Sequence, residues 1–281
     1  MSLYLIAEVG INHNGSMEIA KQLIDAAAKA GFDAVKFQKR TIDQVYTKEL
    51  LDSPRQSPWG STQRAQKEGL EFGVDQYREI DRYCKQLDIE WFASAWDVDS
   101  QIFLRQFNST KNKVASAMLA NWPLLREIAS ERKMTFISTG MATLEEIDAV
   151  VEYFRSVDCP FTLLHTNSTY PMKESNANLR CIPLFRERYK CDVGYSGHET
   201  SLIKVCVAAV TLGATVLERH ITLDRAMYGS DQAASISTHA LDDFVESVRA
   251  VEGILGDGKK EIRPEEAPIR AKLRLDVAKI W

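Results

Sequence analysis

Two histidines follow two consecutive strand-like segments of this 281-residue chain. One segment is Cys191-Asp-Val-Gly-Tyr-Ser-Gly-His198, and the other is Ala214-Thr-Val-Leu-Glu-Arg-His220. A helix-like stretch separates them, so two parallel neighbouring strands would bring both imidazoles to one edge of a sheet. Neutral imidazoles at one edge can share a divalent metal, and we predict such a site at His198 and His220. The alternative is that each histidine only hydrogen-bonds near its strand end.

Lysines and hydroxyl side chains come near the ends of the other strand-like segments. Phosphate and carboxylate groups bind to cationic and hydroxyl donors, so this set indicates an anion site. The strand-end residues concerned are Lys36, Ser94, Lys113, Ser116, Ser138 and Ser196. For Lys36 two alternatives are a salt bridge to Glu8 or Glu218 and a Schiff-base role in an aldolase. For each serine the alternative is to cap the helix that follows.

Short apolar runs and amphipathic segments alternate eight times along the chain. Apolar residues recur at helical spacing between the runs. The predicted strands are residues 4–9, 34–38, 89–94, 113–116, 135–139, 161–166, 192–196 and 215–220. Alternating strands and helices require a parallel sheet, and eight units favour a closed (β/α)8 TIM barrel over an open doubly wound sheet. We therefore predict an α/β protein with one barrel domain, whose chemistry lies at the carboxyl ends of the strands.

Two stretches depart from this alternation. Residues 40–72 are long, polar and proline-containing, and we predict a loop that covers the active site or is disordered. The barrel is expected over residues 1–258, and residues 259–281 are expected to form a tail or short helix. Gly10 and Gly15 match no phosphate-binding motif, so we expect a turn in which Ser16 caps the first helix.

Composition excludes several classes of partner. The chain has 35 Lys and Arg against 39 Asp and Glu, a net charge of −4, and no basic face that would indicate nucleic acid. Its five cysteines lack paired spacing, which is typical of reduced thiols in a cytoplasmic protein. The first apolar run is too short for a signal peptide, and no segment approaches the length of a membrane span.

Several segments of the chain resemble the N-acetylneuraminate (sialic acid) synthase family over roughly residues 3 to 258. They are Ala7-Glu-Val-Gly-Ile-Asn-His-Asn-Gly15, Val35-Lys-Phe-Gln38, Ser57-Pro-Trp-Gly60, Asn121-Trp-Pro-Leu-Leu125, His165 to Pro171, Gly194-Tyr-Ser-Gly-His198 and Glu218-Arg-His-Ile-Thr-Leu-Asp224 with Asp231. The resemblance implies a TIM-barrel enzyme that condenses phosphoenolpyruvate with an aldose such as N-acetylmannosamine. The product would be a nonulosonic acid, and phosphate would be released.

The resemblance also implies roles for individual residues. Mn²⁺ or Mg²⁺ would bind at His198 and His220, and Glu8 would act as acid or base. The implied catalytic residues are Glu8, His198, His220 and Asp231, and the implied substrate-binding residues are Lys36, Gln38, Ser94, Lys113, Ser116, Ser138, Ser168, Tyr170 and Ser196. Lys113 and Ser116 differ in strand parity, so the backbone must bend if both face the site. The alternatives are another metal-dependent aldolase, a 3-deoxy-sugar-acid synthase, or a barrel without catalysis.

The chain departs from the family pattern in two ways. Members usually continue into a small antifreeze-like domain, which supplies an arginine to the sugar site of a neighbouring subunit. We expect no such domain here, and a homodimer remains open. The arginines that could take this role are Arg55, Arg64, Arg263 and Arg270. The segment from Tyr228 to Gln232 also differs from the family's commoner Pro-Gly-x-Asp-His pattern.

Overall fold

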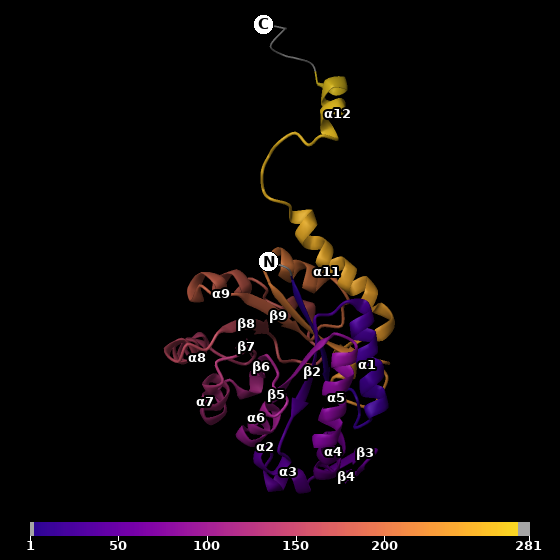
Figure 1. Ribbon diagram of the computed structural model, residues 1–281, viewed down its shortest axis with the longest axis vertical. Coiled ribbons are helices and arrows are strands. Elements are labelled where there is room, and N and C mark those ends of the chain that lie inside the picture. The colour runs from indigo at the N-terminus through magenta and orange to yellow at the C-terminus, as the bar shows by residue number, and fades with distance from the viewer. Residues whose placement is uncertain (1–2, 275–281) are drawn as a thin grey trace.

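The computed structural model describes residues 3–274, and within this range eight parallel strands close into a barrel (Figure 1). The strands are β1 (Tyr4–Gly10), β2 (Ala34–Lys39), β5 (Glu90–Ala95), β6 (Lys111–Val114), β7 (Met134–Ser138), β8 (Phe161–Thr166), β9 (Val193–Gly197) and β10 (Val216–Thr222). The sheet closes because β1 pairs with both β2 and β10. The prediction of a single-domain (β/α)8 barrel is confirmed.

Helices between the strands cover the outside of the barrel (Figure 1). They are α1 (Met17–Ala30), α5 (Val74–Gln86), α6 (Val98–Arg105), α7 (Trp122–Ser130), α8 (Leu144–Ser156), α9 (Cys181–Tyr189), α10 (Lys204–Thr211) and α11 (Leu241–Leu255). As expected, Ser16 caps α1 by accepting a hydrogen bond from the Ile19 N–H. Gly31 ends this helix in the left-handed region, with a φ of 86°.

The two-residue period of the strands divides the barrel interior into an apolar floor and a polar rim. The floor consists of Ile6, Ala34, Phe92, Phe136, Leu164 and Val216. Two residues further along the same strands stand Glu8, Lys36, Ser94, Ser138, Thr166 and Glu218. Side chains two apart point to the same face of a strand, so the inner face changes from apolar to polar in one step. This floor separates the site from the amino-terminal end of the barrel.

Residues 40–72 form an ordered insert between β2 and α5, so the prediction of a loop is wrong. The insert contains α2 (Ile42–Val45), α3 (Lys48–Asp52), the antiparallel hairpin of β3 (Pro54–Ser57) and β4 (Gly60–Thr62), and α4 (Gln63–Leu70). Trp59 packs so closely on Gly69 that a Cβ on this glycine would lie 2.2 Å from the indole. Close packing between small and aromatic residues stabilises the insert, and the polar composition does not reveal it.

The predicted strand 113–116 also needs correction. Strand β6 ends at Val114, and Ser116 begins a short 3-10 helix, Ser116–Met118. This turn is the bend that the strand parity of Lys113 and Ser116 required. It allows both side chains to reach the same cavity although a straight strand would point them to opposite faces.

The C-terminal segment lies away from the insert. Helix α12 (Glu266–Leu273) has no buried residue, and Figure 1 places it beyond the end of α11, on the side of the barrel opposite α2 to α4. Helix α12, which contains Arg270, therefore lies away from the carboxyl ends of the strands in the same chain. The remainder of the predicted tail, residues 275–281, lies outside the described residues. No helix within residues 3–274 is both long and apolar enough to cross a membrane.

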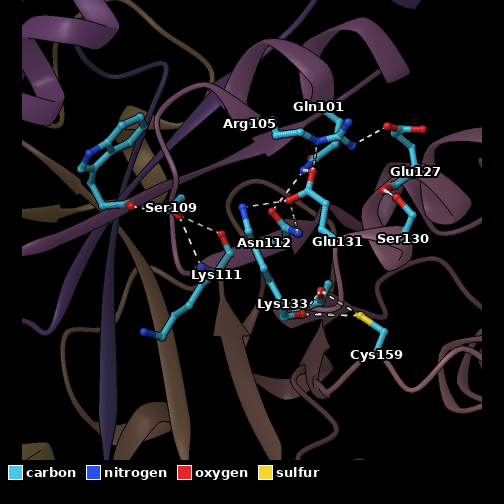
Figure 2. A network of polar contacts seen from close by, with 12 residues as sticks. Gln101, Arg105, Ser109, Lys111, Asn112, Glu127, Ser130, Glu131, Lys133 and Cys159 are labelled. Carbon is cyan, nitrogen blue, oxygen red and sulfur yellow. Dashed lines mark hydrogen bonds and ion pairs between the residues drawn. The ribbon is translucent and has the colours of Figure 1, made fainter.

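A polar network fastens β6 to α6 and α7 on the outside of the barrel (Figure 2). At its centre is the Glu131 carboxylate, which lies 2.8 Å from Gln101 Nε2, 3.2 Å from Asn112 Nδ2, 3.1 Å from Arg105 Nε and 3.1 Å from Lys133 Nζ. Burial alone would raise the pKa of Glu131, but these donors hold the pKa below its ordinary value. The carboxylate is thus fully engaged in holding three elements together.

Candidate active site

A cavity of about 250 Å³ opens at the carboxyl ends of the strands, above the apolar floor. The predicted residues that line it are Glu8, Lys36, Gln38, Ser94, Lys113, Ser116, Ser138, Ser168, Tyr170, Ser196, His198 and His220. They come from every barrel strand or from the loop directly after it. Asp231 stands beside the cavity, with its Oδ2 atom 3.9 Å from His220 Nδ1. The structure therefore brings the predicted residues together at one end of the barrel.

A buried cluster of carboxylates surrounds Lys36. Its Nζ atom is 2.7 Å from Glu8 Oε2 and 3.6 Å from Glu218 Oε1, and it donates a hydrogen bond to Ser94 Oγ at 3.0 Å. Gln38 Nε2 donates to Glu8 Oε1 at 2.7 Å. The alternative that Lys36 pairs with Glu8 or Glu218 is therefore confirmed, with both carboxylates taking part.

This cluster keeps Lys36 charged and makes Glu8 a group that can exchange a proton. Burial raises the pKa of Glu8 to about 7 against the attraction of Lys36, and the Glu218 carboxylate adds to the rise. Burial would lower the pKa of Lys36, but the Glu218 and Glu8 carboxylates outweigh it and the pKa is raised. A Schiff base requires a neutral amine, so this environment disfavours that role for Lys36.

Lys113 is the cation available to an anionic ligand. Its Nζ atom donates to Ser138 Oγ at 2.7 Å and to the Val114 carbonyl at 2.9 Å, and it forms no ion pair within residues 3–274. Burial lowers the pKa of Lys113 to about 8, partly offset by the Glu218 carboxylate. The amine remains mainly protonated at neutral pH, and a bound phosphate or carboxylate would supply the charge that the protein does not.

The serines face the cavity and do not cap helices, so the capping alternative is wrong. The N-cap positions of the α-helices after these strands are instead Asp97, Asn121, Thr143 and Ile203. Ser116 Oγ accepts a hydrogen bond from the Gly140 N–H at 3.0 Å, and the buried Ser168 Oγ has no partner among the described residues. A Cβ on Gly140 would lie 2.2 Å from Ser168 Oγ, so this glycine lets two hydroxyls converge.

The two imidazoles lie side by side at the cavity, with ring centroids 5.6 Å apart. His198 Nδ1 hydrogen-bonds to the Asn167 carbonyl at 2.7 Å. This contact uses Nδ1, so Nε2 is the ring nitrogen of His198 that could bind a metal. His220 Nδ1 is buried and has no hydrogen-bond partner in the described chain. Burial lowers the pKa of His198 to about 4 and also lowers that of His220. Both rings are therefore neutral at pH 7, as a metal ligand must be.

This imidazole pair fits a divalent cation that takes its other ligands from water or substrate. Among residues 3–274 no group of three or more His, Cys, Asp or Glu side chains is placed to hold a metal. The protein would thus contribute two nitrogens, one of them the unpartnered His220 Nδ1. Open coordination positions of this kind are typical of catalytic rather than structural metal sites. The metal itself stays a prediction.

Two features of the site go beyond the residues that were assigned a catalytic or binding role from the sequence, where Glu218 was named only as a possible partner of Lys36 and within the family motif. Glu218 lines the cavity and accepts a hydrogen bond from Ser196 Oγ at 3.1 Å. The sequence could have indicated that Glu218 faces the cavity, because it stands two residues before His220 and therefore on the same face of the strand. Between them Arg219 points outward, with its Nη1 atom 2.6 Å from Glu199 Oε1 and its Nη2 atom 2.7 Å from the Glu199 carbonyl. This buried pair ties the segment after His198 to β10.

A barrel whose cavity combines imidazoles, lysines and a proton-exchanging carboxylate at the carboxyl ends of the strands defines an enzyme-type site. The chain belongs to the NeuB family, whose family profile matches residues 23–260. The resemblance predicted from the sequence motifs is therefore confirmed.

Relatives in the family are synthases of acidic sugars. The chain is 38% identical over 273 residues to human N-acetylneuraminate-9-phosphate synthase, a match covering 96% of this chain and 76% of that protein. It is 32% identical over 268 residues to pseudaminic acid synthase of Campylobacter jejuni, covering 92% and 77%. Among solved structures, the N-acetylneuraminic acid synthetase of Leptospira borgpetersenii superimposes with a TM-score of 0.86 at 30% identity, covering 98% of this chain and 93% of that one.

Proposed function

We propose that this chain condenses phosphoenolpyruvate with the open-chain aldehyde of an N-acylated aldose such as N-acetylmannosamine. The products would be a sialic-acid-like sugar acid and inorganic phosphate. The relatives named above support a synthase of this general kind. The observation that carries the proposal is that Lys113 and Glu8 line the same cavity. Lys113 forms no ion pair among the described residues, and the pKa of the Glu8 carboxyl group is raised to about 7.

Phosphoenolpyruvate would lie on the lysine and serine side of the cavity. Lys113 and Lys36 would bind its phosphate and carboxylate as point charges, and the hydroxyls of Ser116, Ser138 and Ser168 would add hydrogen bonds. The apolar floor beneath them excludes water from that side, which strengthens these interactions. Binding at fixed positions also holds the nucleophilic carbon near the aldehyde.

The reaction forms a carbon–carbon bond and a carbon–oxygen bond from water, and it breaks the carbon–oxygen bond to phosphate. Carbon 3 of phosphoenolpyruvate attacks the aldehyde carbon, and the carbonyl electrons become an alkoxide that takes up a proton. Water adds to carbon 2 and loses a proton, and the resulting tetrahedral centre expels phosphate to leave the keto acid. Glu8 is the proposed group that accepts the proton of the water or protonates the alkoxide, because a carboxyl group with a pKa near 7 can do either.

His198 and His220 are the residues that would hold Mn²⁺ or Mg²⁺ beside the aldehyde. Such an ion, when bound, supplies Lewis-acid polarisation of the carbonyl oxygen. We expect Mn²⁺ titrated into the chain and followed by electron paramagnetic resonance to bind, and His198→Ala and His220→Ala each to weaken this binding. The matched control is His239→Ala, which changes an exposed imidazole. Equal Mn²⁺ affinity in all four proteins would remove the ion from this site.

Phosphate release tests the reaction. The chain is incubated with phosphoenolpyruvate, a divalent cation and a panel of aldoses with and without a 6-phosphate. We expect phosphate release that requires both substrates, and a product whose mass equals the two substrates plus water minus phosphoric acid. A chelator should abolish the release, and added Mn²⁺ or Mg²⁺ should restore it. Phosphate release without any aldose, or none with the whole panel, would overturn the proposal.

A further inference from the structure

The backbone pairing of β9 with β10 ends just before the two imidazoles. Its last pair is Gly197 with Arg219, and the next residues on the two segments are His198 and His220. His220 stays within β10 and pairs with Glu8 of β1, whereas His198 lies one residue beyond the end of β9. The position of His198 relative to His220 is therefore not set by the β9–β10 ladder and depends on other contacts.

A buried ion pair connects the two segments at this point. Glu199 directly follows His198, and Arg219 directly precedes His220. The side chains of Glu199 and Arg219 are 0% and 1% exposed. Arg219 Nη1 lies 2.6 Å from Glu199 Oε1, and Nη2 donates a hydrogen bond to the Glu199 carbonyl at 2.7 Å. The guanidinium thus binds both the side chain and the backbone of the residue beside His198.

The Glu199 carboxylate is itself anchored in the strand and the helix around it. Its Oε2 atom accepts a hydrogen bond from the Tyr195 hydroxyl at 2.8 Å, and its Oε1 atom accepts one from Cys206 Sγ at 3.5 Å. A Cβ on Gly197 would lie 2.5 Å from Glu199 Oε2, so this close approach requires glycine. Contacts to β9, β10 and α10 therefore fix the carboxylate, and with it the backbone that carries His198.

The loop after β8 holds His198 from the other side. The Met172 N–H donates to the His198 carbonyl at 2.9 Å, and Met172 forms a parallel bridge with Glu199. The Asn167 carbonyl contacts His198 Nδ1 at 2.7 Å. The segment after β9 is thus held between this loop and Arg219, and a shift of Glu199 would alter the contact with Met172 as well.

Stability alone does not account for a charged pair at this place. Removing two charges from water is costly, and a well-packed apolar pair in a protein interior is often at least as stable. Neither Glu199 nor Arg219 is among the described residues that line the cavity, so neither would touch the substrates of the proposed reaction. What this pair provides, and an apolar pair would not, is a directional contact of fixed geometry.

We propose that Glu199 and Arg219 are positioning residues for the imidazole pair: they fix His198 relative to His220, so that both rings can bind one divalent cation. The inference rests on the proposed function, which assigns the cation to these rings. Contacts behind metal ligands orient the ligands, and their loss commonly weakens metal binding by about tenfold to a hundredfold.

The first test measures Mn²⁺ affinity by electron paramagnetic resonance, without substrates. Glu199→Gln removes the charge that Arg219 contacts, and we expect the affinity to fall by roughly tenfold. Tyr195→Phe removes only the hydroxyl that anchors Glu199, so it should fold and show a smaller loss in the same direction. The matched control is Tyr189→Phe, which should bind Mn²⁺ as the unmodified chain does. The Tyr189 hydroxyl also donates to a carboxylate at 2.8 Å, that of Asp148, and neither residue is among those that line the cavity.

Hydrogen exchange provides a second readout, which needs no metal. The Met172 amide should exchange faster in Glu199→Gln and Tyr195→Phe, because it donates to the His198 carbonyl that the pair holds in place. The Thr215 amide donates at 2.9 Å to a carbonyl at the other end of the same strand pair, and its exchange should not change. A role in the stability of the fold alone would instead accelerate both amides equally.

An unchanged Mn²⁺ affinity in every variant that folds would overturn the positioning role, as would exchange that is accelerated equally at both amides or at neither. If the unmodified chain does not bind Mn²⁺, the cation is removed from the proposed function, and exchange decides the positioning of His198 by itself. Faster exchange at Met172 alone then supports it, and unchanged exchange at Met172 refutes it.

Discussion

Glu8 in the cavity and Glu131 in the network of Figure 2 are both buried, with side chains 1% and 6% exposed, yet their pKa values move in opposite directions. The pKa of Glu8 rises to about 7, and that of Glu131 falls below its ordinary value. Four side-chain donors engage Glu131. Glu8 has Gln38 and one cation, Lys36, which it shares with Glu218.

The comparison shows that burial alone does not decide what a carboxylate does. A buried carboxylate whose lone pairs are met by several donors stays charged and holds its neighbours in place. One that shares a single cation with a second carboxylate exchanges its proton near neutral pH. The first arrangement stabilises the fold outside the barrel, and the second prepares chemistry inside it.

The strongest test of this contrast is Glu8→Gln. Glutamine keeps the shape and the contact with Gln38 but cannot exchange a proton, so we expect kcat to fall by about 10²–10⁴-fold. The midpoint of thermal unfolding should change little, because Glu218 remains as a partner for the buried charge of Lys36. Stopped-flow or steady-state phosphate release measures the first quantity and calorimetry the second. Normal turnover with lowered stability would make Glu8 a structural partner of Lys36.

A second test compares two lysines on one strand. Lys113→Met removes the cation proposed to bind phosphoenolpyruvate, and we expect its KM to rise by roughly tenfold to a hundredfold, the loss of one charge-assisted hydrogen bond. Lys111→Met is the matched control. Lys111 lies at the other end of the barrel, where its Nζ atom is 2.5 Å from Glu90 Oε2. The KM for phosphoenolpyruvate should not change in this control. An unchanged KM in both variants would place the anion site elsewhere.

Glu131→Gln probes the other member of the comparison. The change keeps the shape of the side chain and removes the charge that Arg105 and Lys133 contact. We expect the free energy of unfolding to fall by about 1–3 kcal/mol. Urea denaturation would measure this, and kcat should stay within about twofold of the unmodified chain because no side chain of the network lines the cavity. A large loss of kcat with unchanged stability would contradict the division of roles.

The smallest expected effect is on the pH dependence of stability. The folded pKa of Glu8 is raised from 4.5 to about 7, so its contribution to stability is fully present below pH 4.5 and is lost as the pH rises through 7. The folded pKa of Glu131 is lowered, so its contribution is present above pH 4.5 and is lost as the pH falls. Denaturation from pH 2.5 to 8 should show Glu8→Gln removing the first trend and Glu131→Gln the second. Identical pH profiles in all three proteins would refute both assignments.

Most of the fold was predictable because the period of the hydrophobic pattern changes between strand and helix. The same period placed Lys36 and Gln38 on one face, and the structure finds both in the cavity. The ordered insert was not predictable from composition, since its stability depends on Trp59 packing against Gly69. Long-range packing of this kind leaves no periodic signal in a polar segment.

Within the site, the identity of the lining residues was predictable and their pairing was not. The sequence left Lys36 with two carboxylate partners, and only the closed barrel shows that it contacts both. The strand parity of Lys113 and Ser116 showed that the backbone must bend between them, but only the structure shows that the bend follows Val114.

The alternation along β10 limits how this chain can vary in length. Glu218 and His220 line the cavity, and Arg219 between them contacts Glu199 on the outer side. Deletion of one residue within the strand would exchange the two faces, bringing the guanidinium into the cavity and turning the carboxylate and imidazole toward the helices. Insertions and deletions should therefore be tolerated in the surface loops but not in β10. A designer who wishes to shorten or graft this barrel has to change such strands by two residues at a time.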